Sequence, residues 1–135
     1  MKNSLMNTYG EQSPIMVKGE GCYLYDINGK KYLDLTSGIG VNSLGYNNEK
    51  WTKAVTNQVT TLQHCSNIFT NPTTIEASNK LVEKAGMSKV FFANSGAEAN
   101  EGAIKLARKY SFEKYGDGRN KVLTLKKSFH GRTIT

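Results

Sequence analysis

The apolar positions in the first part of the chain fall in short runs separated by turn residues, a pattern that is typical of β-strands. Such runs occupy residues 14–17, 22–26 and 31–35, and the pair Asn28-Gly29 is a strong signal for a tight hairpin turn. We therefore predict a small antiparallel sheet. The polar residues 1–13 have no period and are expected to form an arm that needs a partner to be ordered.

Two later segments have the apolar period of amphipathic helices. The first is predicted over Glu49–Thr61 with Asn48 as its cap, and the second begins at Pro72 and ends before Gly86. Residues 36–46, between the sheet and the first helix, are rich in glycine and small polar residues, which favours a loop.

The second half of the chain combines both patterns. Val90–Ala93 is a short run of β-formers and predicts a buried strand, and the helical period then runs from Ala97 to Tyr115. A second strand is predicted over residues 121–126. Strand, helix and strand together indicate a right-handed βαβ crossover with parallel, buried strands.

The start of this helix could bind an anion. The first N–H groups of a helix have no partner within it, and Gly96 and Ala97 are small enough to let a phosphate approach. Ser95-x-x-Glu98 is also a capping box, in which the Ser95 hydroxyl caps the helix and Glu98 reaches back. The two interpretations are compatible, because one serine can cap a helix and contact a ligand.

Two motifs together resemble a known family. Asn94–Glu101 with the following Lys105–Arg108, and the downstream run Ser128–Thr133, are similar to segments of the pyridoxal-phosphate-dependent aminotransferases of class III, which act on ω-amino groups. The likeness is greatest to the acetylornithine aminotransferases. It extends from about Pro14 to the last residue of this chain, which corresponds to only the first part of such an enzyme.

The resemblance implies an α/β fold: the N-terminal part of a fold-type I transferase, with an antiparallel hairpin segment before the first βαβ unit of the large domain. Residues 1–60 would be the arm, hairpin and helix of the small-domain part, and residues 61–135 the start of an incomplete large domain. The loop 36–46 would lie at the active-site entrance near the subunit interface, although Tyr46-Asn47-Asn48 replaces the His-Pro pair usual in the family.

The resemblance also implies a function. The turn Ser95–Ala97 would hold the phosphate of pyridoxal 5′-phosphate, Phe129 would stack on its ring beside His130, and Arg132 would pair with the substrate carboxylate. The full enzyme would transfer the amino group of N2-acetylornithine to 2-oxoglutarate in arginine biosynthesis, as a cytoplasmic homodimer. Because ligands of open α/β sheets sit at the carboxyl ends of strands, both motifs are expected to face one crevice.

Two requirements of this cofactor are not met by any residue here. In the family, the lysine that forms the Schiff base and the aspartate that binds the pyridine nitrogen lie further along the chain. We therefore assign no catalytic residue and no metal ligand, and we expect the isolated chain not to transaminate. Two parallel strands cannot form a shielded sheet by themselves, so the sequence predicts the N-terminal part of a larger enzyme rather than a self-sufficient domain.

Other interpretations stay open at this point. Ornithine, succinylornithine and 4-aminobutyrate aminotransferases share these motifs, and a non-catalytic anion-binding module would need only the turn at Gly96. Taken singly, Phe129 would be a core aromatic, His130 a structural histidine and Arg132 a surface charge; it is their spacing after the helix that favours a site. The dinucleotide and P-loop fingerprints G-x-G-x-x-G and G-x-x-x-x-G-K-[ST] do not occur.

Composition adds little to this picture. The net charge is +7, but the cations are scattered without a basic tract, which argues against nucleic-acid binding. No apolar run is long enough to cross a bilayer, and the N-terminus has no signal-peptide core, so a cytoplasmic location is expected. Cys22 and Cys65 lack metal-ligand spacing and are expected to be free, buried thiols.

Overall fold

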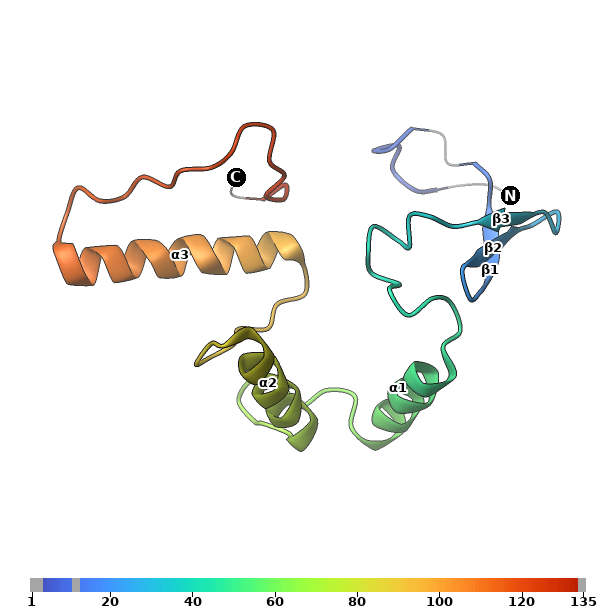
Figure 1. Ribbon diagram of the computed structural model, residues 1–135, viewed down its shortest axis with the longest axis horizontal. Coiled ribbons are helices and arrows are strands. Elements are labelled where there is room, and N and C mark those ends of the chain that lie inside the picture. Colours follow the sequence, from blue (N-terminus) through green and yellow to red (C-terminus); the bar gives the residue numbers. More distant parts are fainter. Residues whose placement is uncertain (1–3, 11–12, 134–135) are drawn as a thin grey trace. The chain divides into compact units, whose positions relative to one another are not determined.

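The computed structural model describes residues 4–10 and 13–133, and the chain divides into two compact units, Met1–Cys65 and Ser66–Thr135. The first unit holds three strands and one helix, and the second holds two helices (Figure 1). These elements are β1 (Met16–Glu20), β2 (Tyr23–Asp26), β3 (Lys31–Leu33), α1 (Glu49–Thr61), α2 (Pro72–Ala85) and α3 (Gly96–Tyr115). The assignment of residues 1–60 and 61–135 to parts of two domains stays a prediction.

The predicted antiparallel sheet is confirmed, with the strand order β1-β2-β3. In the hairpin, Tyr23 pairs with Leu33 and Tyr25 with Lys31. Gly29 has the positive φ of 79° that the turn requires, and its N–H donates to the Asp26 carbonyl at 2.9 Å. The first strand begins at Met16 rather than at residue 14, and the third ends at Leu33 rather than at residue 35.

A buried carboxylate closes this hairpin. Asp26 is only 5% exposed, and its carboxylate accepts hydrogen bonds from the N–H groups of Asn28 and Lys30 at 2.9 Å and from the Tyr32 hydroxyl at 3.0 Å. Burial by itself raises the pKa of Asp26, but the hydrogen bonds from Lys30, Tyr32 and Asn28 outweigh it and hold that pKa below its ordinary value. The hairpin turn is thus built around an ionised side chain.

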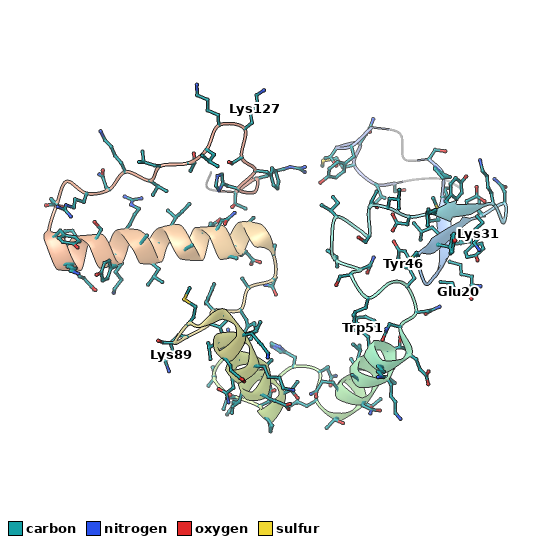
Figure 2. The ribbon with its side chains drawn as sticks, in the orientation of Figure 1. Glu20, Lys31, Tyr46, Trp51, Lys89 and Lys127 are labelled. Atoms are coloured by element: carbon teal, nitrogen blue, oxygen red, sulfur yellow. The ribbon has the colours of Figure 1, made fainter. Side chains whose placement is uncertain are left out.

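Tyr46 fastens the end of the glycine-rich loop to the sheet (Figure 2). Its backbone exchanges two hydrogen bonds with Gly21, at 3.0 and 2.7 Å, and its hydroxyl donates to the Asp34 carboxylate at 2.7 Å. The ring covers Gly19 so closely that a Cβ on that residue would come within 3.0 Å of it. The loop 36–46 is therefore irregular, as predicted, but it is held at a defined place.

Removing the Tyr46 hydroxyl should change the titration of Asp34. Hydrogen bonds from the Thr36 hydroxyl, the Tyr46 hydroxyl and the Thr36 N–H lower the pKa of Asp34 from 3.8 to about 2. Because the folded-state pKa is the lower one, the stability from this carboxylate is present above pH 3.8 and is lost as the pH falls towards about 2. In Tyr46→Phe we expect the pKa of Asp34, followed by carbon NMR, to rise towards 3.8.

Tyr32→Phe is the matched control, since the Tyr32 hydroxyl donates to Asp26 and not to Asp34. This variant should raise the pKa of Asp26 and leave that of Asp34 unchanged. An Asp34 titration that is the same in wild type and in Tyr46→Phe would show that the tyrosine does not hold the carboxylate.

The three predicted helices are confirmed, together with the predicted caps Asn48 and Ser95 of α1 and α3. The Asn48 side chain accepts from the Trp51 N–H, and Asn71 caps the α2 helix that begins at Pro72. The α2 helix ends at Gly86, which is left-handed with a φ of 64°. Each helix therefore begins at a residue whose side chain satisfies a free backbone donor.

The two predicted strands that flank α3 are wrong for the described part of the chain. Neither residues 90–93 nor residues 121–126 form a β-ladder, and Phe91 is 71% exposed instead of buried. A strand is stable only when a neighbour takes up its N–H and C=O groups, and the described residues provide no such neighbour. Residues 122–125 line an open groove along α3 with a volume of about 700 Å³.

The described residues contain no buried apolar side chain. Cys22 is exposed and Cys65 is half-buried, so the expectation of buried thiols is wrong, although neither cysteine forms a disulfide in the described part of the chain. Burial of one large apolar side chain contributes about 1.5–3 kcal/mol, so most of the hydrophobic stabilisation that this sequence could supply is not realised in this arrangement. No helix among the described residues has the length and apolar character that a membrane crossing needs.

Candidate functional site

The first turn of α3 is capped by Ser95, as predicted. Its Oγ accepts a hydrogen bond from the Glu98 N–H at 3.2 Å, and its hydroxyl donates to the Glu98 carboxylate at 3.1 Å. Asn94 donates to the other carboxylate oxygen at 3.3 Å. Glu98 therefore reaches back to the Ser95 hydroxyl, whereas a standard capping box would use the Ser95 N–H.

The helix start is open beside this cap. A Cβ built on Gly96 would meet no atom within 4 Å. Among the described residues, no acceptor is hydrogen-bonded to the N–H groups of Gly96 and Ala97. With the positive end of the helix dipole added, this surface favours the approach of an anionic group.

The turn 128–133 lies against the same end of α3, although 30 or more residues separate the two in sequence (Figure 1). Gly131 contacts Ala97: a Cβ on Gly131 would stand 2.9 Å from the Ala97 Cα. Gly131 also has a φ of 111°, which side chains with a Cβ rarely adopt. The structure thus brings the two predicted motifs together at a residue where only glycine fits.

Two hydrogen bonds secure the turn. Asn100 donates from its amide to the His130 carbonyl at 2.9 Å. The Thr133 side chain is hydrogen-bonded to the Glu101 carboxylate, and this bond, followed by that from Lys105, holds the pKa of Glu101 below its ordinary value. Lys105 forms an (i, i+4) ion pair with Glu101 at 2.9 Å.

The predicted binding residues of the turn differ in their surroundings. Phe129 is 75% exposed, so the ring is open to a flat partner. The Arg132 guanidinium carbon lies 5.7 Å from the centre of that ring, within the range of a cation–π contact. The Nε2 atom of His130 is buried and has no hydrogen-bond partner among the described residues, which is unusual for a purely structural histidine.

Sequence reasoning missed Asn100 and Thr133, which both bind between the helix and the turn. A signal was available for Asn100. Asparagine is a poor helix former because its amide competes with the backbone, so its place in the second turn of α3 called for a partner outside the helix. For Thr133 no such signal existed, since a threonine in a loop is unremarkable.

Comparisons with known proteins agree with these motifs. The family Aminotransferase class-III matches residues 6–135. The chain belongs to the class-III aminotransferase family. It is 51% identical over 133 residues to the acetylornithine aminotransferase of Haemophilus ducreyi and 52% identical to that of Caldanaerobacter subterraneus, covering 98% of this chain and 34% of each relative.

A solved structure extends this likeness to three dimensions. The Toxoplasma gondii ornithine aminotransferase, whose structure is described as having partial occupancy of pyridoxal phosphate at its active site, matches 98% of this chain with a TM-score of 0.88 and 30% identity. The match covers 31% of that protein. The chain therefore spans about a third of the length of the class-III aminotransferases that it matches.

Proposed function

We propose that the protein is an acetylornithine aminotransferase, which uses pyridoxal 5′-phosphate to move the amino group of N2-acetylornithine to 2-oxoglutarate in arginine biosynthesis. The family uses this cofactor. The substrate is supported by the identity of 51–52% with acetylornithine aminotransferases. A cytoplasmic homodimer is part of the same proposal and rests on the family likeness alone.

The observation that carries the proposal is the contact between Gly131 and Ala97. It places the turn with Phe129 and Arg132 beside a helix start that is open to an anion. The phosphate and ring ends of pyridoxal phosphate fit these residues, since the helix offers free N–H groups and the turn offers an exposed ring. A motif match without this contact would have supported only a family likeness.

Each residue then has a defined task. The N–H groups of Gly96 and Ala97 would bind the phosphate, and the Ser95 hydroxyl would donate to it in place of the Glu98 carboxylate. Phe129 would lie flat on the cofactor ring. The Arg132 guanidinium would hold the substrate carboxylate through two parallel hydrogen bonds. The cofactor itself supplies the carbonyl group that accepts the amino group from one substrate and returns it to the other.

We also propose that the chain is the N-terminal part of a fold-type I transferase. In that fold the segments 90–93 and 121–126 would pair with strands outside this sequence, which would cover the exposed side chains around Phe91. The lysine and the carboxylate that such a cofactor requires would also lie outside it.

The proposed substrate can be tested with the full-length protein. The rate of 2-oxoglutarate-dependent transamination is measured with N2-acetylornithine, ornithine, N2-succinylornithine and 4-aminobutyrate as donors. We expect the highest kcat/KM for acetylornithine. A higher kcat/KM for any of the other three donors would show that this donor is the substrate and that the enzyme is still an aminotransferase. The absence of transamination with all four donors would contradict the proposed function.

A pair of substitutions at Ser95 separates capping from phosphate binding. Alanine removes both the cap and the hydroxyl and costs about 1 kcal/mol of helix stability, whereas glycine is nearly as good a cap as serine. If the hydroxyl binds the phosphate, Ser95→Ala and Ser95→Gly should weaken pyridoxal phosphate binding by a similar factor, on the order of tenfold. The dissociation constants are measured by absorption titration of the cofactor-free protein. Wild-type affinity in Ser95→Gly would leave the serine as a cap only.

A further inference from the structure

We infer that Asn100 is a positioning residue for the cofactor site: its side-chain amide sets where the turn 129–132 lies along α3. The inference rests on the proposed function, because it assigns the turn its role in binding pyridoxal phosphate. It goes beyond that function by giving a task to Asn100, which lies in the first motif but has no role in the phosphate binding or ring stacking proposed above.

The Asn100 side chain links two segments that are distant in sequence, α3 and the turn 129–132. The residue lies in the second turn of α3 and is half-buried. Its Nδ2 donates to the His130 carbonyl at 2.9 Å, across 30 residues of sequence. An asparagine inside a helix normally lowers helix stability, so a long-range bond from its amide offsets an intrinsic disadvantage of this residue type.

The acceptor of this bond is at the centre of the turn. The His130 carbonyl lies between the residue that would stack on the cofactor, Phe129, and the glycine that contacts the helix. The Gly131 contact limits how near the turn can come to α3, since the glycine backbone lies close to the Ala97 methyl group and Cα. A close approach does not fix position along the helix, whereas a directional hydrogen bond does.

The hydrogen bond of Thr133 to α3 cannot replace that of Asn100. The Thr133 side chain bonds to Glu101, but Thr133 is exposed and follows the binding residues rather than lying among them. Without the Asn100 bond, the turn would lose the hydrogen bond to α3 that lies next to Phe129 in sequence. A displacement of about 1 Å at such a site can cost a factor of about 100 in function.

The test measures pyridoxal phosphate affinity of the full-length, cofactor-free protein by absorption titration. In Asn100→Ala we expect the dissociation constant to rise about tenfold, with little change in the thermal unfolding midpoint because alanine is the better helix former. Asn79→Ala, at an exposed position of α2, is the matched control and should bind as wild type does.

A double-mutant cycle separates positioning from general stability. If Asn100 acts through the turn, then Asn100→Ala should affect affinity much less when Phe129 is already alanine. The rise in the dissociation constant caused by Asn100→Ala should then fall from about tenfold to below about threefold. An equal factor in both backgrounds, or wild-type affinity in Asn100→Ala, would overturn the inference and leave the proposed function intact. Absence of pyridoxal phosphate binding by the wild type would instead overturn the proposed function, and this inference with it.

Discussion

Replacing Gly131 with alanine should abolish tight cofactor binding. A Cβ at this position would stand 2.9 Å from the Ala97 Cα, and the φ of 111° is strained for any residue other than glycine. Strain of this kind costs about 1–3 kcal/mol, and forcing an extra methyl group into a closed contact costs a similar amount. Because the turn can avoid both only by leaving the helix, we expect pyridoxal phosphate affinity to fall by a factor of 100 or more, on the order of 3 kcal/mol.

Gly118→Ala is the control that separates the two causes. Gly118 has a similar φ of 101°, but a Cβ there would meet nothing within 4 Å. This variant should lose some stability to urea through backbone strain and should keep its affinity for the cofactor. If Gly131→Ala and Gly118→Ala had equal, small effects on affinity, the contact with Ala97 would not hold the turn.

Replacing Arg132 with alanine should raise KM for 2-oxoglutarate by about 100-fold while leaving pyridoxal phosphate affinity nearly unchanged. The physical reason is the loss of a charge-assisted, two-pronged hydrogen bond to a carboxylate, which no neutral side chain reproduces. Arg132→Lys should restore only a small part of the effect, because an ammonium group presents a point charge rather than a planar fork. Steady-state kinetics with varied 2-oxoglutarate give both values.

Arg119→Ala provides the comparison for general charge effects. The Arg119 guanidinium lies 4.2 Å from the Tyr115 ring, at the opposite end of α3 from the proposed site. Removing it changes the net charge by the same amount and should leave KM for 2-oxoglutarate unchanged. An unaltered KM in Arg132→Ala would remove that arginine from carboxylate binding.

Local signals in the sequence predicted the local structure. Asn28-Gly29 predicted the hairpin, because Gly29 suits the positive φ that the turn requires. Asn48 and Ser95 gave helix starts, because a short polar side chain is the usual partner of a free N–H group. None of these features depends on residues far away in sequence.

The failures concern structure that depends on distant partners. Residues 90–93 and 121–126 have the composition of strands, but composition does not supply the neighbour whose hydrogen bonds make a strand. Asn100 was overlooked for the same reason, since its partner is a backbone carbonyl 30 residues away. The proximity of the two site motifs was expected from the position of ligands in α/β sheets, whereas in the structure it comes from Gly131 packing on Ala97.

The way the chain returns along α3 has a consequence for changes in its length. Two of the hydrogen bonds that fasten the returning segment to the helix lie far apart along α3: Ser111 donates to the Arg119 carbonyl and Asn100 donates to the His130 carbonyl. The helix from Asn100 to Ser111 and the returning segment from Arg119 to His130 are of equal length, about eleven residues each. As a helix, eleven residues span about 16 Å, whereas an extended segment of that length can reach about 36 Å. The surplus is taken up where the chain doubles back at Lys126-Lys127, with Lys127 at a φ of 62° (Figure 2). Insertions should therefore be tolerated at these two lysines. A residue added to α3 between Asn100 and Ser111 should instead rotate and displace these two side chains relative to each other, so that both hydrogen bonds to the returning segment can no longer form together.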